Sequence, residues 1–147
     1  HLKSLGAEVG IVFDFEAIKV GPNTLDAHRL IHWAGQESRE TQTRVVDLLF
    51  KANFEQGRNI GDAAVLLDIA TEAGLSRPVI ESLLAGDADV NHVLSEVEAA
   101  KQMGVNGVPF FIFDQQYAVS GAQPPAELAN ALREIAKAKA EALRNLN

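Results

Sequence analysis

The chain has 147 residues, of which 47% are hydrophobic and 22% are charged, and its formal net charge at pH 7 is −7. This length and composition fit one ordered globular domain, alone or with a large insertion, and they exclude an intrinsically disordered chain. The acidic balance without a basic stripe argues against nucleic acid and membrane surfaces as partners, and the apolar runs are too short to cross a bilayer.

Residues 1–22 are predicted to hold the end of a helix and an extended linker. Leu2, Leu5 and Val9 have the spacing of the last turns of a helix, and Gly10 follows them. Because the chain starts within this pattern and without a methionine, we expect it to be a fragment of a longer protein. The next stretch, IVFDFEAIKVGP, is predicted to be extended.

A helical domain is predicted over residues 23–103. Apolar residues recur at helical spacing in five segments, and helix-capping residues or glycines separate them. The five helices are expected to begin near Asn23 or Thr24, Ser38, Asp62, Ser76, and Asp87 or Asp89. Helices of this length joined by short turns favour an antiparallel bundle.

The core of this domain is predicted from the apolar face of each helix. Met103 and the phenylalanines are also assigned to the core. The other predicted core residues are Ala27, Leu30, Ile31, Ala34, Val45, Leu48, Leu49, Ala52, Leu66, Ile69, Ala70, Ala73, Val90, Val93, Leu94 and Val97.

From Gly104 onward the period of the apolar residues changes to that of strands. Two β-prone runs, 110–114 and 117–120, flank a short turn of two glutamines and predict a hairpin. Pro124 then opens a long amphipathic helix. The predicted fold class is therefore mostly α with a small β-hairpin (α+β), in which residues 104–147 form a ββα part.

The most informative segment is GVNGVPFFIF, in which Pro109 leads into the first predicted strand. Proline has no N–H group to donate, so a sheet tolerates it at the first residue of a strand. A cis bond costs little before proline, and Gly104 and Gly107 allow the tight corner that such a bond makes. The alternative is an ordinary trans proline at the end of a loop, which is the commoner isomer.

The order of these segments resembles a known family. A helical segment, GVNGVPFFIF, a short hairpin, SGAQPP and an amphipathic helix together resemble the C-terminal half of the DsbA-like disulfide oxidoreductases, which have a thioredoxin-like fold. The upstream stretch NTLDAHRLIHWA resembles the helical insertion of the cytoplasmic FrnE-like branch. The resemblance implies a partial thioredoxin-like fold, with residues 23–103 as the helical insertion domain, a cis bond at Pro109 and a cytoplasmic location.

The resemblance also implies a thiol–disulfide oxidoreductase that acts on protein or small-molecule disulfides. The chain has no cysteine, so its redox cysteines would lie outside this chain, no catalytic residue is assigned on it, and it is expected to be inactive alone. Gly107, Val108 and Pro109 would bind an extended peptide substrate through their backbone. His28, His32 and Trp33 are placed near a groove that faces this corner; the alternative is two surface histidines and a half-buried aromatic residue.

The sequence is compatible with two other functions. A related branch of the superfamily isomerises 2-hydroxychromene-2-carboxylates with glutathione and also has a G-V-P corner; without that activity, no cofactor is expected. The second alternative is a non-catalytic module that binds a peptide or a second copy of the chain, so that a homodimer completes the open sheet edge. His28 and His32 have the spacing of metal ligands, but no third ligand is evident and no metal is predicted.

Overall fold

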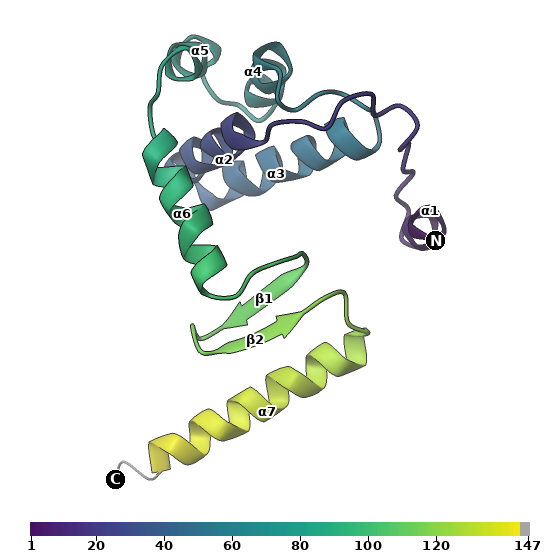
Figure 1. The fold of residues 1–147 in the computed structure, drawn as a ribbon, viewed down its shortest axis with the longest axis vertical. Helices are drawn as coiled ribbons and strands as arrows, with labels where there is room; N and C mark the ends of the chain where they lie inside the picture. Colours follow the sequence, from purple (N-terminus) through teal and green to yellow (C-terminus); the bar gives the residue numbers. More distant parts are fainter. Residues whose placement is uncertain (145–147) are drawn as a thin grey trace. The chain divides into compact units, whose positions relative to one another are not determined.

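A computed structural model describes residues 1–144, apart from the side chain of Leu143, and shows a mostly helical protein with one β-hairpin (Figure 1). This confirms the predicted mostly α architecture with a small hairpin. In chain order the elements are α1 (Leu2–Glu8), α2 (Leu25–Glu37), α3 (Arg39–Phe54), α4 (Ala63–Glu72), α5 (Arg77–Ala85), α6 (Val90–Gln102), β1 (Phe110–Phe113), β2 (Tyr117–Ser120) and α7 (Pro125–Arg144).

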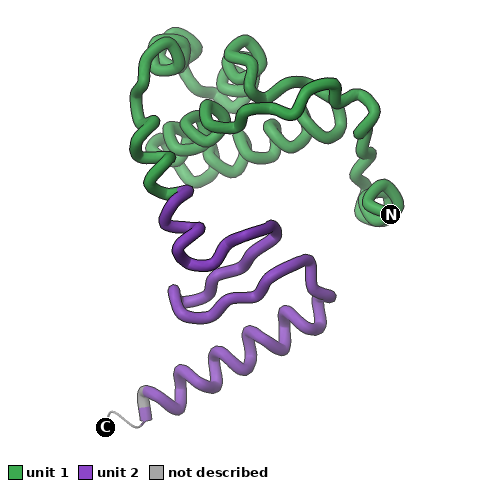
Figure 2. The backbone as a smooth tube through the Cα atoms, viewed as in Figure 1, with its two compact units in different colours: residues 1–96 green, residues 97–147 purple. Residues whose placement is uncertain are grey.

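The chain divides into two compact units, and their boundary lies within α6 (Figure 2). Unit 1 is residues 1–96 and holds helices α1 to α5 with the first part of α6. Unit 2 is residues 97–147 and holds the hairpin and α7. Residues 145–147 of the predicted ββα part lie outside the described residues.

Local capping chemistry explains where the helices of unit 1 begin. The Ser38 hydroxyl accepts the N–H of Thr41 at 3.0 Å, and the Asp62 carboxylate accepts the N–H of Ala64 at 2.8 Å. Each bond satisfies a backbone donor that has no partner within its helix. Ser76 precedes α5 and a proline occupies its first turn, where a missing N–H costs nothing. The predicted starts of these three helices are confirmed.

The core of unit 1 lies between α2, α3, α4 and α5. Leu30, Val45 and Leu66 have 0% of their surface exposed, and each comes from a different helix. Burial of such side chains contributes roughly 1.5–3 kcal/mol each, so these three helices hold one another in place. The other hydrophobic residues of the core cluster are Ala27, Trp33, Ala34, Leu49, Ala52, Leu67, Ile69, Ala70, Ala73, Leu75 and Ile80.

Part of the predicted core is wrong, chiefly on α6. Val93 is buried, but Leu94 is 50% exposed and Val97 is 41% exposed. Met103 is 54% exposed and Phe50 is 59% exposed. The period of apolar residues defines a helix face but does not say whether another element covers it.

The stretch predicted to be extended forms no strand. It runs as an irregular segment with a turn at residues 15–17, and the Asp14 N–H donates to the Phe54 carbonyl at 2.8 Å. Gly57 lies beneath this segment with φ of +62°, and a Cβ added there would lie 2.5 Å from the backbone of Ala17. Gly57 therefore ends the α3 region and also lets the N-terminal segment approach closely.

Replacing Gly57 with alanine is expected to lower the free energy of unfolding by about 2–4 kcal/mol, because positive-φ strain and overpacking against Ala17 act together. Gly74 is the matched control: its φ is +94°, yet an added Cβ would meet nothing within 4 Å. Gly74→Ala should cost only the strain, about 1–2 kcal/mol. Urea denaturation followed by circular dichroism measures both, and equal losses would show that contact with Ala17 does not matter.

Unit 2 is an antiparallel hairpin with α7 along it. Phe111 pairs with Val119 and Phe113 pairs with Tyr117, so these side chains share one face of the hairpin. The rings of the two phenylalanines are stacked, with centroids 6.4 Å apart. In unit 2, no residue with a described side chain is buried.

The hairpin turn begins one residue earlier than predicted. Asp114 was expected to end the first strand, but it has φ of +54°, and Gln115 has φ of +56°. Two successive left-handed residues reverse the chain with the twist that a hairpin favours, and aspartate tolerates this conformation. The Lys139 ammonium lies 2.8 Å from the Asp114 carboxylate, which links α7 to the turn.

None of the helices described between residues 1 and 144 combines the length and apolar character that a membrane span requires.

Candidate functional site

The corner before β1 is a candidate site within unit 2. The Val108–Pro109 peptide bond is cis, and the Pro109 carbonyl accepts the N–H of Gly121 at 2.8 Å. Val108 is 89% exposed, and an added Cβ at Gly107 would meet nothing within 4 Å. The backbone of this corner is therefore open to an incoming ligand.

The hydrogen bond of Pro109 sets the phase of the strand pairing. Along an antiparallel ladder, every second residue of a strand forms backbone hydrogen bonds with the partner strand. Because Pro109 forms such a bond, the residues of β1 that bond to β2 are Phe111 and Phe113. Phe110 and Ile112 therefore direct their backbone N–H and C=O groups to the outer edge of β1, where the described residues provide no further strand. This edge can add an extended peptide.

A separate candidate site lies in unit 1, on α2. Trp33 is only 5% exposed, and its indole N–H donates to the Asp89 carboxylate at 2.8 Å. His32 is half-buried, and its Nε2 lies 4.0 Å from the same carboxylate. The ring of His92, on α6, lies 4.3 Å from that of His32 between centroids. The structure thus brings His32 and Trp33 together around Asp89 and adds His92.

The remaining predicted site residues are not part of this group. His28 is exposed one turn earlier on α2, while Gly107, Val108 and Pro109 belong to unit 2. Within residues 1–144, no three histidine, aspartate or glutamate side chains are arranged to hold a metal ion. The roles of these residues in substrate binding stay predictions.

Arg29 is a structural residue that the sequence analysis missed. It is 2% exposed, and its guanidinium donates to Asp26 at 2.8 Å and lies 4.9 Å from the centre of the Trp33 ring. It also donates to three carbonyls, those of Leu83 at 2.7 Å, Gly86 at 2.9 Å and Ala88 at 2.7 Å. The planar guanidinium satisfies several carbonyls at once and ties α2 to the α5–α6 connection. A signal was present in the sequence, because Arg29 lies between two apolar positions of the helix, Ala27 and Leu30.

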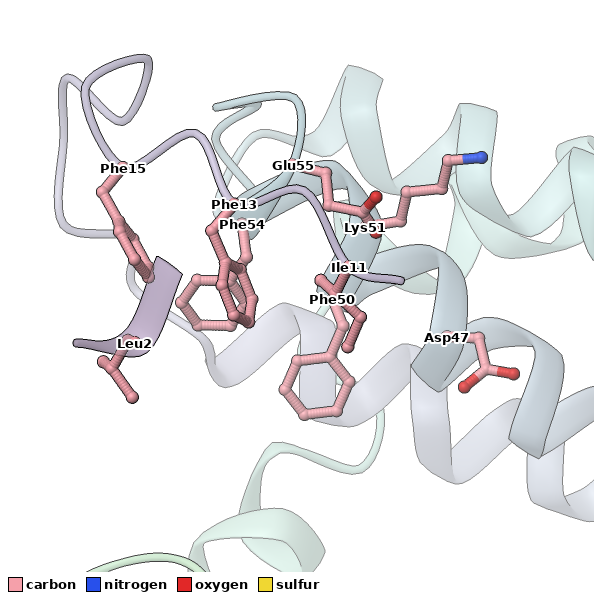
Figure 3. Close-up of a pocket in the computed structure, with 9 residues that line it drawn as sticks. All are labelled: Leu2, Ile11, Phe13, Phe15, Asp47, Phe50, Lys51, Phe54 and Glu55. Atoms are coloured by element: carbon pink, nitrogen blue, oxygen red, sulfur yellow. The ribbon is translucent and has the colours of Figure 1, made fainter. Parts of the chain in front are cut away.

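An apolar pocket of about 610 Å³ forms in unit 1 beside the N-terminal segment (Figure 3). Phe13 and Phe15 come from that segment, and Phe50 and Phe54 come from α3. Phe13 stacks on Phe15 with centroids 5.1 Å apart and meets the edge of Phe54 at 6.3 Å. The remaining lining residues are Leu2, Ile11, Asp47, Lys51 and Glu55.

The side chains that line this pocket suit the binding of a ligand rather than nucleophilic catalysis. Four aromatic rings can take up an apolar group, and no lining residue is a thiol or hydroxyl nucleophile. The sequence contained the signal for it. Phe50 and Phe54 are four residues apart and share a helix face, and Phe13 and Phe15 are two apart in a short apolar segment.

Comparisons with known proteins agree on one family. The model of the DSBA-like thioredoxin domain matches residues 1–133. The crystal structure of a probable DsbA oxidoreductase from Streptomyces coelicolor superposes with a TM-score of 0.79 at 31% sequence identity. The aligned part covers 90% of this chain and 56% of the Streptomyces chain, so the chain spans little more than half of that protein. No curated protein matches the chain.

The match to the family model extends over most of the chain, and the solved neighbour shares both fold and sequence with it. The predicted DsbA-like, thioredoxin-related fold is therefore confirmed. This protein chain belongs to the family of DsbA-like thioredoxin domains.

Proposed function

We propose that this chain is part of a thiol–disulfide oxidoreductase whose redox cysteines lie outside these 147 residues. The observation that carries the proposal is the family match over residues 1–133 in a chain without cysteine. The Streptomyces neighbour, named a probable DsbA oxidoreductase, supports the proposal. Only 56% of that chain is aligned, so the remaining 44% has no counterpart in these 147 residues.

The finer assignment is to the FrnE-like branch, with a cytoplasmic location. The stretch NTLDAHRLIHWA supports this choice, because it resembles the helical insertion of that branch. In the structure this stretch includes most of α2, whose residues Arg29 and Trp33 hold the α5–α6 connection in place.

In the proposed reaction a cysteine thiolate attacks one sulfur of the substrate disulfide and forms a mixed disulfide, and the other substrate sulfur leaves as a thiolate. A second cysteine thiolate then attacks the mixed disulfide, which releases the reduced substrate and leaves the enzyme oxidised. The substrate is an extended peptide segment of a protein. This chain contributes the binding surface, namely the backbone of Gly107, Val108 and Pro109.

An insulin-reduction assay tests this proposal. The chain alone should show no turnover, because it has no thiol. The longer product of the same reading frame should contain a C-x-x-C upstream of His1 and reduce insulin, and changing both of its cysteines to serine should abolish the activity. A longer product that keeps both cysteines yet shows no turnover would contradict the proposal, as would an upstream sequence without C-x-x-C.

The same longer product separates the enzyme classes. Turnover of a 2-hydroxychromene-2-carboxylate in the presence of glutathione, without insulin reduction, would assign the isomerase activity instead. The corner at Val108 and Pro109 would then serve a small-molecule substrate.

A further inference from the structure

The loop before β1 contains the one Asn-Gly pair of the sequence, Asn106 and Gly107. In such a pair the backbone nitrogen of the glycine can attack the side-chain amide of the asparagine, because no Cβ hinders its approach. The attack requires a backbone N–H that is not already hydrogen-bonded, an exposed asparagine and a segment that can adjust its backbone. Asparagine is accordingly one of the thermolabile residues of proteins.

The structure satisfies all three requirements at Asn106. The Val105 N–H donates to the Ala100 carbonyl at 3.1 Å and closes the end of α6. The next backbone hydrogen bond along the chain is the one that the Pro109 carbonyl accepts. Between these two points, the Gly107 N–H and the Asn106 side chain have no hydrogen-bond partner among the described residues. Both residues are exposed, and the space around Gly107 is open.

The other described asparagines lack this combination. The side-chain oxygens of Asn23 and Asn59 are held by backbone N–H groups at 3.1 and 3.0 Å. Asn53 is buried, and Asn130 lies within α7, where the following N–H is committed to the helix. Asn91 lies in the first turn of α6 and is followed by His92, whose Cβ hinders the attack. They serve as internal controls for the reactivity of Asn106.

We propose that Asn106 is a site of spontaneous deamidation. The deprotonated Gly107 nitrogen attacks Cγ of Asn106, a new N–Cγ bond forms, the Cγ–Nδ2 bond breaks and ammonia leaves. Water then opens the resulting five-membered succinimide at either carbonyl, which gives aspartate or isoaspartate. The balance is one water consumed and one ammonia released, with no oxidant or reductant.

The modification changes the approach to the corner in two ways. Each event adds a negative charge to a chain whose net charge is already −7. Isoaspartate also adds one carbon to the main chain, two residues before Val108. A loss of peptide binding at the corner would follow only under the proposed function, whereas the modification itself does not depend on that function.

The test is to incubate the chain in mildly alkaline buffer and map it by mass spectrometry. Trypsin releases residues 102–133 as one peptide, which holds both Asn106 and Asn130. Fragment ions should show loss of most of the Asn106 amide while the Asn130 amide in the same peptide stays intact. An isoaspartyl methyltransferase should methylate the aged chain and not the fresh one.

Two variants make the result specific to the proposed chemistry. Gly107→Ala places a Cβ beside the attacking nitrogen, and it should fold normally because Gly107 lies outside the left-handed region in open space. Asn106→Gln lengthens the side chain by one carbon. Both variants should retain the amide at position 106. The proposal would be overturned if, in the chain without substitutions, Asn106 kept its amide while other asparagines were deamidated. Equally fast deamidation of Asn106 in Gly107→Ala would also overturn it.

Discussion

Replacing Arg29 with methionine is expected to lower the free energy of unfolding by about 3–5 kcal/mol, as removal of one side of a buried charged network does. The variant leaves the carbonyls of Leu83, Gly86 and Ala88 without their guanidinium donor in the interior of unit 1. Methionine retains much of the side-chain volume, so the loss reports on the hydrogen bonds rather than on a cavity. The bond to Asp26 contributes little, because the Asp26 side chain is 40% exposed.

Urea denaturation measures this effect, with circular dichroism for the helices and the single tryptophan, Trp33, as a probe of unit 1. Arg44→Met on α3 is the matched control, because Arg44 is exposed and should change stability by no more than about 0.5 kcal/mol. Arg29→Lys should be nearly as damaging as methionine, since one ammonium cannot reach all three carbonyls. Equal stabilities of the Arg29→Met and Arg44→Met variants would show that the network is not structural.

Replacing Leu66 with alanine is expected to cost about 3–5 kcal/mol, through lost burial and the cavity left behind. Leu66 has 0% exposure on α4, at the centre of the core between the helices. The matched control is Leu94→Ala on α6, where the leucine is 50% exposed. That substitution should cost no more than about 0.5 kcal/mol.

These two variants distinguish the prediction from apolar periodicity from the packing seen in the structure, because the sequence pattern assigns both leucines to the core. The measurement is the same denaturation, followed through Trp33. Similar losses of unfolding free energy in Leu66→Ala and Leu94→Ala would contradict the structure and favour the prediction from apolar spacing, which places both leucines in the core.

Local chemistry made most helix boundaries predictable. Ser38 and Asp62 cap their helices because their side-chain oxygens accept a backbone N–H that the helix itself cannot satisfy, a requirement that acts over a few residues. The alternation of apolar residues placed the two strands of the hairpin correctly, apart from Asp114 at its turn. The family followed from the order of these elements and from a few short segments.

The candidate site was predicted less completely. The corner at Gly107, Val108 and Pro109 is continuous in the chain, so a single segment revealed it. Arg29 was missed, and Asp89 was predicted only as a helix start, because their partners at this site lie more than fifty residues away in the sequence. Spacing along one helix cannot show which loop carbonyls will surround a charged side chain.

By itself the sequence determined the class of elements and most of their starting residues, since periodicity and capping act within a few residues, and its composition determined that this chain has no thiol. Only the tertiary structure decided that Leu66 is buried while Leu94 is exposed, that Arg29 is enclosed by three carbonyls, and that four phenylalanines line one pocket. Burial and hydrogen-bond partnership depend on which surfaces meet in space, and local periodicity carries no information about the surface opposite.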